Sequence, residues 1–274
     1  MTKARRAVGV VGLGAMGEPI ARHLALAGHP LLVVDPERTA TAQAADIPGV
    51  QVARTPAELA ETSALVLIVV GNDEQVREVV TGPTGVLAAH AATTVLVCST
   101  VQPATVQELA ARAADLGVAL LDAALVGGLR AAHAGGLTLL VGGDVEALDG
   151  VRPELAAWTQ SVHHLGPLGA GQIAKSANNL IHWAQVCAIH EAFRIVERAG
   201  LSVPAVRRAL QDGPADSRAL HELELMKFTW WRKDLIGYTA LAEELGADHS
   251  VGDLCANLMP AISVEEIATL FGPK

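Results

Sequence analysis

The sequence predicts an α/β protein with an N-terminal doubly wound parallel sheet, then a long helix, then an all-helical C-terminal domain. Three observations predict this class. Apolar strand patterns alternate with helix patterns as far as about residue 166, and beyond about residue 199 the periodicity is purely helical. Of the 274 residues, 51% are hydrophobic but only 3% are aromatic, so small aliphatic side chains must build the core. We expect a first domain over residues 1–166 and a second over residues 167–274 that begins with the long helix.

The chain is acidic, with a formal net charge of −9, which argues against nucleic acid and anionic membrane surfaces as partners. No apolar run reaches the length that spans a bilayer, and the basic start is not followed by a signal-peptide cleavage site. Cys98, Cys187 and Cys255 lie far apart, without the spacing of metal ligands. We therefore expect a soluble cytoplasmic protein with reduced thiols and no metal site.

The first elements predict a dinucleotide-binding turn of the Rossmann type. A strand over Ala7–Val11 runs into a glycine-rich turn, a helix follows over residues 15–27, and a second strand, Leu31–Val34, ends at Asp35. The turn consists of Gly12, Leu13, Gly14, Ala15, Met16 and Gly17. In such a turn the first glycine allows the tight bend, the second lets a pyrophosphate approach the backbone, and the third lets helix and strand pack closely. The start of the helix then offers free N–H groups to the phosphates.

Asp35 bears on the choice of cofactor. A carboxylate at the end of the second strand accepts hydrogen bonds from the adenosine ribose hydroxyls and repels a 2′-phosphate, so the sequence favours NAD over NADP. Arg38 lies close enough to blur that preference.

The remaining elements of the first domain continue the alternation. Strands are expected over residues 50–53, 64–70, 94–98, 118–121, 137–141 and 162–165, and helices over 56–61, from near Pro103, and over 145–158. Polar or flexible positions follow three of these strands, at the edge where a doubly wound sheet binds its ligand. After the strand that ends at Val70 comes a turn over residues 71–73. After the next strand comes the pair Ser99 and Thr100, and after the third a loop over residues 123–130 that contains Val126, Gly127 and Gly128. Ser99 could instead cap the helix that follows it.

The long helix opens at Gly169 and Gly171 and continues to about residue 199. Lys175 and Asn179 are four residues apart, so they project from one face of it. No other lysine or arginine precedes Arg194 in this apolar run, and partial burial lowers the pKa of a lysine toward the range useful for proton transfer. The alternative is a snorkelling lysine beside a surface amide pair.

Beyond this helix, further helices are expected over residues 203–211, 218–227, 235–245 and 264–271. Because the helical domain is small for so long an apolar helix, we expect a homodimer in which each long helix packs on the partner.

Several motifs in order carry a family resemblance over nearly the whole chain. They are residues 12–17 (GLGxMG), Ser99-Thr100, residues 122–128 (DAALVGG, where the family has DAPVSGG), the run from Gly135 to Gly143, residues 169–179 (GxGxxxKxxNN) and Lys233-Asp234-Leu235. In these the chain resembles the β-hydroxyacid dehydrogenases, the group of 3-hydroxyisobutyrate and tartronate-semialdehyde enzymes, which is related to 6-phosphogluconate dehydrogenase.

The resemblance implies hydride transfer between a hydroxyacid and NAD or NADP. Lys175 would act as general base in oxidation and general acid in reduction, and Asn179 would orient the substrate. Gly127 and Gly128 would offer backbone N–H groups to a carboxylate, and Lys233 would contact the nicotinamide side of the cofactor.

Two departures from the family pattern affect the substrate site. Val126 replaces the family's serine, and Ala124 its proline, which removes a charge-assisted hydrogen bond worth about 1.5–3 kcal/mol. Arg130 is a candidate replacement donor. The C-terminus is also short after Lys233, so His182 and Trp230 or Trp231 could line the far wall of the pocket or serve only in packing.

Three hypotheses remain at this point. The first is an NAD(P)-dependent dehydrogenase of a small β-hydroxyacid or its semialdehyde. The second is an imine reductase-like enzyme, or another reductase of a substrate without a carboxylate, which Val126 favours and the presence of Lys175 opposes. The third is a non-catalytic dinucleotide-binding protein, which the pair Lys175 and Asn179 argues against.

Overall fold

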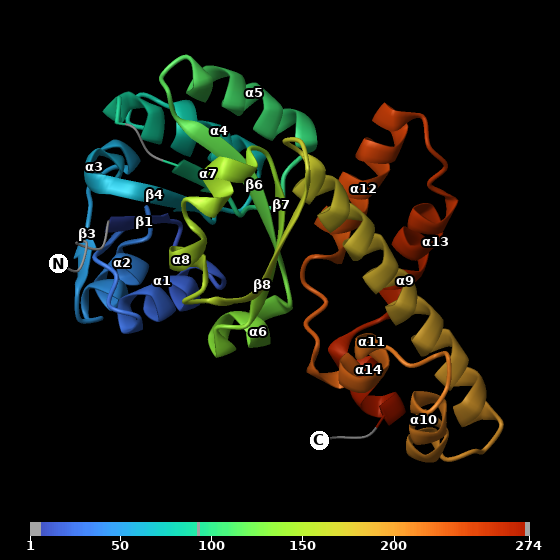
Figure 1. The fold of residues 1–274 in the computed structure, drawn as a ribbon. Helices are drawn as coiled ribbons and strands as arrows, with labels where there is room; N and C mark the ends of the chain where they lie inside the picture. The colour runs from blue at the N-terminus through green and yellow to red at the C-terminus, as the bar shows by residue number, and fades with distance from the viewer. Residues whose placement is uncertain (1–6, 92–93, 272–274) are drawn as a thin grey trace. The chain divides into compact units, whose positions relative to one another are not determined.

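The computed structural model describes residues 7–91 and 94–271. The chain divides into two compact units, Met1–Lys175 and Ser176–Lys274. The predicted fold class is confirmed: a doubly wound sheet, a long helix and an all-helical remainder follow one another along the chain (Figure 1).

The first unit is built on one eight-stranded sheet, in the order β3-β2-β1-β4-β5-β6-β7-β8. The strands are β1 (Ala7–Val11), β2 (Leu31–Val34), β3 (Val50–Val52), β4 (Ser63–Ile68), β5 (Thr94–Val97), β6 (Ala119–Val126), β7 (Leu137–Gly142) and β8 (Thr159–Gly166). All neighbours are parallel except β6 and β7. The strand order reverses between β1 and β4. That reversal is where an open α/β sheet binds its ligand, outside the carboxyl ends of its strands.

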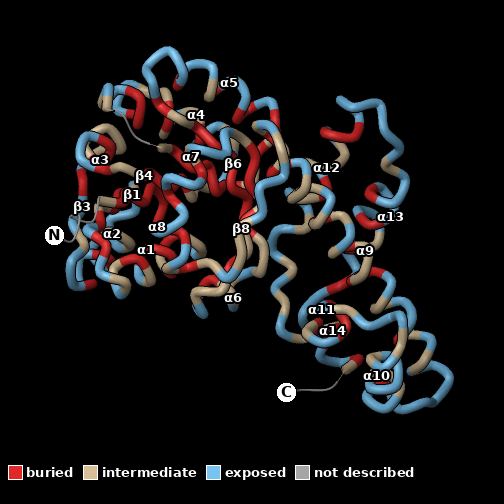
Figure 2. Tube along the Cα trace, viewed as in Figure 1, coloured by how far each residue is buried: buried red, intermediate tan, exposed pale blue. Residues whose placement is uncertain are grey.

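Helices cover both faces of this sheet. On one face lie α1 (Gly17–Leu26), α2 (Arg38–Ala45), α6 (Gly128–Ala134), α7 (Val145–Asp149) and α8 (Arg152–Leu155). On the other lie α3 (Pro56–Thr62), α4 (Asp73–Thr81), the short η1 (Val86–Ala89) and α5 (Pro103–Ala114). Strand β4 shows why its sequence is apolar throughout: Leu65 and Leu67 enter the first core, whereas Val66 and Ile68 enter the second. Figure 2 shows the buried central strands in red.

The structure corrects the prediction of a loop over residues 123–130. Strand β6 continues to Val126, because its second half pairs antiparallel with β7, from Asp122 opposite Gly142 to Val126 opposite Thr138. Only Gly127 lies between the end of β6 and the start of α6.

Two predicted helices are also divided. The expected helix over residues 145–158 is α7 and α8, which are separated at Gly150 and Val151. The expected helix over residues 218–227 is α11 (Arg218–Glu222) followed by a single 3₁₀ turn, η2 (Leu223–Leu225).

The second unit is helical. It holds most of α9 (Ala170–Arg198), then α10 (Val203–Gln211), α11, η2, α12 (Trp231–Leu245), α13 (Ser250–Leu258), η3 (Met259–Ala261) and α14 (Val264–Phe271). Its main core gathers Trp183, Val186 and Cys187 of α9 with Leu235 of α12 and Cys255 of α13. Of the described helices, no single one is both long and apolar enough to cross a membrane. The bent pair of residues 250–261 and 264–271 passes that test only when joined across an 80° angle.

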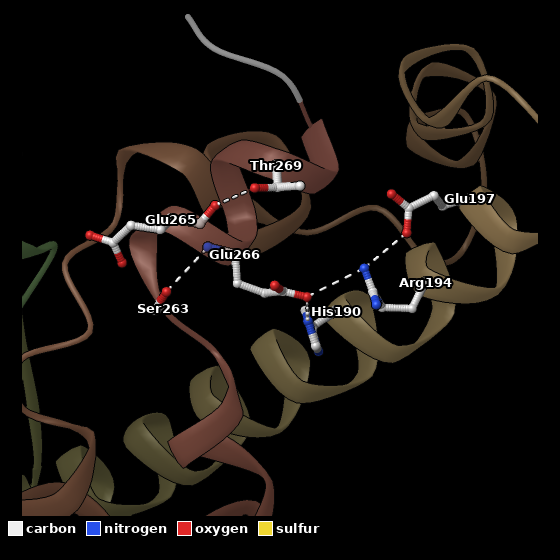
Figure 3. A network of polar contacts seen from close by, with 7 residues as sticks. All are labelled: His190, Arg194, Glu197, Ser263, Glu265, Glu266 and Thr269. Carbon is white, nitrogen blue, oxygen red and sulfur yellow. Dashed lines mark hydrogen bonds and ion pairs between the residues drawn. The ribbon is translucent and has the colours of Figure 1, made fainter.

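Polar contacts also join α9 to α14 (Figure 3). Glu266 Oε1 lies 3.3 Å from His190 Nε2 and 3.5 Å from Arg194 Nη1, and Arg194 in turn pairs with Glu197. Ser263 accepts the Glu266 N–H at the start of α14. These contacts fix α14 against the C-terminal part of α9.

Candidate active site

The glycine-rich turn lies between β1 and α1, at the reversal of the strand order. Gly12 has a φ of 95°, and a Cβ there would lie 2.4 Å from the carbonyl oxygen of Val69. A Cβ on Gly17 would lie 1.9 Å from the carbonyl oxygen of Gly12, so only glycine lets α1 begin this close to the turn. A Cβ on Gly14 would meet nothing within 4 Å. Gly14 has open space beside it, whereas Gly12 and Gly17 leave no room for a side chain. This arrangement fits the way such a turn receives a pyrophosphate. Leu13 is buried in the first core, the half-buried Met16 packs against the same core, and Ala15 is exposed.

Asp35 closes β2 next to this turn. Its Oδ2 accepts the Leu13 N–H at 2.6 Å, and its Oδ1 accepts the Glu37 N–H at 2.7 Å. A carboxylate has about four acceptor positions, so each oxygen keeps one for a further donor such as a ribose hydroxyl. Arg38 is exposed at the start of α2, where Glu37 caps the helix.

The ends of β4 and β5 are joined by Ser99. Its hydroxyl accepts the Val70 N–H at 2.8 Å and donates to the carbonyl of Ile68 at 3.3 Å. It therefore supports the turn after β4 and does not cap α5, whose N-cap is Gln102. Thr100 follows, half-buried. Val70 and Thr100 thus lie at the ends of neighbouring strands, on the edge that carries the glycine turn.

The end of β6 presents backbone in conformations that favour glycine. Gly127 has a φ of 121° and Gly128 a φ of 70°. Val126 is half-buried in the strand before them, and Arg130 is exposed on α6.

The start of α9 is anchored by Asp122, which is fully buried in β6. Its Oδ1 accepts the Gly169 N–H at 2.7 Å and its Oδ2 accepts the Gln172 N–H at 2.8 Å. Burial raises the pKa of Asp122 above its ordinary 3.8, and these hydrogen bonds oppose the rise. Sequence reasoning missed Asp122 and Gln172 as site residues. The available signal was a carboxylate inside an otherwise apolar strand.

Lys175 lies in the second turn of α9 and is half-buried. Helix α9 is continuous, so Asn179, one turn further on, projects from the same face. Asn179 is only 5% exposed, and its Oδ1 accepts the Asn178 side-chain amide at 3.2 Å. The alternative of a snorkelling lysine beside a surface amide pair predicts an exposed Asn179, so the burial of Asn179 argues against it.

The other predicted residues lie within the second unit. His182 is half-buried on α9, with its ring 4.7 Å from that of Trp183. Trp183 donates to Asp234 at 3.0 Å, which fixes α12 against α9. On α12, Trp231 packs on the core with Arg232 over its ring, and Lys233 is exposed. Trp230, the other tryptophan considered for the pocket wall, is 43% exposed.

All three cysteines are free thiols. Burial raises the pKa of Cys98, next to Ser99, to about 12, and it raises that of Cys187 to about 12 as well. Neither is a nucleophile near neutral pH. Within the described ranges, no three His, Cys, Asp or Glu side chains are grouped as metal ligands.

Two family models match this chain. Residues 7–166 match the NAD binding domain of 6-phosphogluconate dehydrogenase, and residues 169–268 match the NAD-binding of NADP-dependent 3-hydroxyisobutyrate dehydrogenase. The chain belongs to the β-hydroxyacid dehydrogenase family. It is an NAD(P)-dependent dehydrogenase acting on CH–OH groups.

This dehydrogenase is similar to several named proteins. The NAD-dependent L-serine dehydrogenase of Pseudomonas aeruginosa is 33% identical over 214 residues, which cover 78% of this chain and 72% of that one. A solved structure of Mycobacterium tuberculosis 3-hydroxyisobutyrate dehydrogenase with L-serine is 29% identical, covers 97% of this chain and 99% of its own, and has a TM-score of 0.87.

Imine reductases share the fold of this dehydrogenase. One from Myxococcus stipitatus covers 94% of this chain and 93% of its own, with a TM-score of 0.70 but only 17% identity. At that identity the likeness shows the fold alone.

Proposed function

We propose that this dehydrogenase transfers a hydride between the nicotinamide of NAD or NADP and a small β-hydroxyacid or its semialdehyde, with Lys175 as general acid and base. The observation that carries the proposal is the placement of Lys175. It follows the first turn of α9, whose N–H groups donate buried hydrogen bonds to Asp122 and so fix this turn to the sheet that carries the glycine turn. Asn179 projects from the same face of the helix.

In the oxidation, Lys175 accepts the proton of the substrate hydroxyl while hydride leaves the carbinol carbon, and a carbonyl forms. In the reduction, Lys175 returns the proton to the carbonyl oxygen. Nicotinamide supplies the hydride acceptor in one direction and the hydride donor in the other. The residues of this chain contribute alignment, since well-oriented reactants avoid most of the entropic cost of the encounter.

For the substrate, we propose that Gly127 and Gly128 offer backbone N–H groups to the carboxylate and that Asn179 orients the hydroxyl. Gly127 and Gly128 have φ values of 121° and 70°, which favour glycine, and a Cβ on Gly128 would meet nothing within 4 Å. His182 and Trp231 are proposed to line the far wall of the pocket. L-serine, a β-hydroxyacid that appears in the names of both relatives, is our first candidate substrate.

For the cofactor, we propose that residues 1–166 hold the dinucleotide, with the pyrophosphate at the glycine turn. Val70, Thr100 and Lys233 would contact its nicotinamide half. Asp35 favours NAD, since each carboxylate oxygen keeps a lone pair for a ribose hydroxyl and its charge repels a 2′-phosphate. We further propose a cytoplasmic homodimer.

The experiment that tests the substrate class is turnover of NAD⁺, NADP⁺, NADH and NADPH, followed by absorbance, across a panel. The panel holds L-serine, 3-hydroxyisobutyrate, aldehyde acids, neutral ketones and cyclic imines. We expect turnover on the carboxylate substrates. Activity confined to neutral ketones or imines would contradict the proposal.

A second candidate, a reductase of a substrate without a carboxylate, is favoured by Val126, which cannot donate the hydrogen bond of the family's serine. Val126→Ser separates the two. If carboxylates are the substrates, the added donor raises kcat/KM on them by about tenfold, a gain of about 1.4 kcal/mol. If neutral compounds are the substrates, the serine gives no such gain.

A further inference from the structure

In the first unit, three buried polar side chains connect the start of α9 to the middle of β6 and to the segments that follow β4 and β5. They are Asp122, Gln172 and Ser99, which are 0%, 2% and 4% exposed. Buried polar groups are costly unless every donor and acceptor is paired, so such a network persists only where its partners fix it.

Asp122 fixes where α9 begins. Besides accepting the N–H groups of Gly169 and Gln172, its carboxylate fills the space beside two glycines. A Cβ on Gly171 would lie 2.2 Å from the carbonyl oxygen of Leu140 and 2.6 Å from Asp122 Oδ2, and a Cβ on Gly142 would lie 2.5 Å from Asp122 Oδ1. The helix therefore starts in direct contact with β6 and β7, without room to slide.

Gln172 fixes how α9 is oriented against β5. Its Oε1 accepts the Val101 N–H at 3.1 Å, and its Nε2 donates to the Ser99 carbonyl at 2.9 Å. Both partners are backbone groups of fixed polarity. A flipped amide would set donor against donor and acceptor against acceptor, so only one orientation of Gln172 is satisfied.

Ser99 extends this connection to the turn after β4, because its hydroxyl accepts the Val70 N–H. Hydrogen bonds thus run from the first turn of α9, through Gln172 and Ser99, to Val70. Lys175 is three residues after Gln172, one turn further along the same helix.

We propose that Gln172 is a positioning residue, which sets the place of the Lys175 amine relative to the cofactor-side loops after β4 and β5. This inference rests on the proposed acid–base function of Lys175. Gln172 does not take part in the proton transfer. It acts by holding the helix that carries the lysine, and a misplacement of about 1 Å can cost about 100-fold in rate.

The first test compares Gln172→Ala with Gln107→Ala. Gln107 is a matched control because its amide also donates next to the start of α9, to the Leu168 carbonyl at 3.4 Å, but it is exposed.

Four quantities are measured: kcat, KM, the dissociation constant of NADH, and the unfolding temperature. For Gln172→Ala we expect kcat to fall about 10- to 100-fold while NADH binding changes by less than about threefold. Gln107→Ala should match the wild type. A Gln172→Ala protein that is folded and keeps wild-type kcat overturns the inference.

The second test uses Gln172→Glu, which keeps the volume of the side chain and carries the test if Gln172→Ala does not fold. An ionised glutamate can accept the Val101 N–H but sets its other oxygen against the Ser99 carbonyl, whereas the protonated acid can donate to that carbonyl. The ratio of Gln172→Glu activity to wild-type activity, measured for the reduction, should therefore rise as the pH is lowered. Asp122, which accepts the Gln172 N–H, Asp73, which accepts the Gln102 N–H, and Lys175 are present in both proteins, so the ratio removes the titration that the two proteins share. A ratio that does not change with pH overturns the inference.

The same assay on Lys175→Met separates this inference from the function beneath it. Wild-type turnover in Lys175→Met refutes the acid–base proposal and the positioning role with it. Loss of turnover in Lys175→Met, together with wild-type kcat in Gln172→Ala, refutes the positioning role alone.

Discussion

Asp122 shows at the scale of one residue how a buried charge is kept in a sheet. The carboxylate has no exposed surface, yet each oxygen accepts a backbone N–H from the start of α9. Desolvation raises the pKa of the carboxyl group and outweighs these hydrogen bonds, which lower it. The folded state therefore holds this proton more tightly than the unfolded chain does.

A pH dependence of stability follows from Asp122. Between the unfolded pKa of 3.8 and the raised folded value, the folded state binds more protons, so stability falls as the pH rises through that window. Below it, both states are protonated and the penalty vanishes. We expect the unfolding free energy of the wild type, relative to Asp122→Asn, to decrease as the pH is raised from about 3 and then to level off. Urea unfolding at a series of pH values measures it. A difference that grows with pH would contradict this account.

Asp35 gives a second prediction at this scale. Asp35→Ser removes the charge that repels a 2′-phosphate and weakens the contacts proposed for the ribose hydroxyls. The ratio of kcat/KM for NAD to that for NADP should fall about 10- to 100-fold, as expected for the loss of a charge-assisted hydrogen bond. Glu61→Ser, an exposed acid at the end of α3, is the control and should leave the ratio unchanged. An unchanged ratio in Asp35→Ser would remove Asp35 from the cofactor proposal.

At the scale of the elements, the β1–α1 turn was predictable because its constraints are local. Ala7–Val11 and Leu31–Val34 were predicted at their observed bounds, and the constraint on Gly17 comes from the carbonyl of Gly12 in the same turn. The second half of β6 was not predictable in this way, because it is a strand only through pairing with β7.

The connections at the start of α9 were not predictable either. The hydrogen bond from Gln172 to Asp122 joins residues 50 apart in sequence, and that from Gln172 to Ser99 joins residues 73 apart. A sequence pattern identifies Lys175 as a candidate, but it does not show which distant residues hold the helix in place.

The glycine turn gives a paired prediction at this scale. Gly17→Ala forces a methyl group against the Gly12 carbonyl, so we expect a cost of about 1–3 kcal/mol or more and a lower unfolding temperature. Gly14→Ala meets no atom within 4 Å and should leave the unfolding temperature unchanged while weakening NADH binding. Differential scanning calorimetry and NADH fluorescence titration measure the two effects. If Gly14→Ala binds NADH as the wild type does, the pyrophosphate does not lie at this turn.

At the scale of the whole molecule, α9 carries exposed apolar side chains at heptad spacing. Ile181 and Ile195 are 58% and 65% exposed, and the exposed Ala188 lies midway between them. Such a stripe along a long helix favours association with an apolar partner, which we propose to be a second copy of this chain.

Charged substitutions on this stripe test the dimer. Ile181→Glu and Ile195→Glu should convert a dimer to monomer, because each would bury an unpaired carboxylate in the interface. Leu26→Glu is the control, since Leu26 is 77% exposed on α1 and lies outside the stripe. Sedimentation velocity at micromolar concentration measures the state. A wild-type monomer, or variants that remain dimeric, would refute an interface along this stripe.

The most direct test of the central claim is the turnover of Lys175→Met under saturating substrate and cofactor. Lys227→Met, a change at an exposed lysine, is the matched control. Loss of a general acid–base group should lower kcat by about 10²- to 10⁴-fold, with the dissociation constant of NADH within about threefold of the wild type. Lys227→Met should turn over normally. A Lys175→Met protein that binds NADH and keeps wild-type kcat would contradict the account.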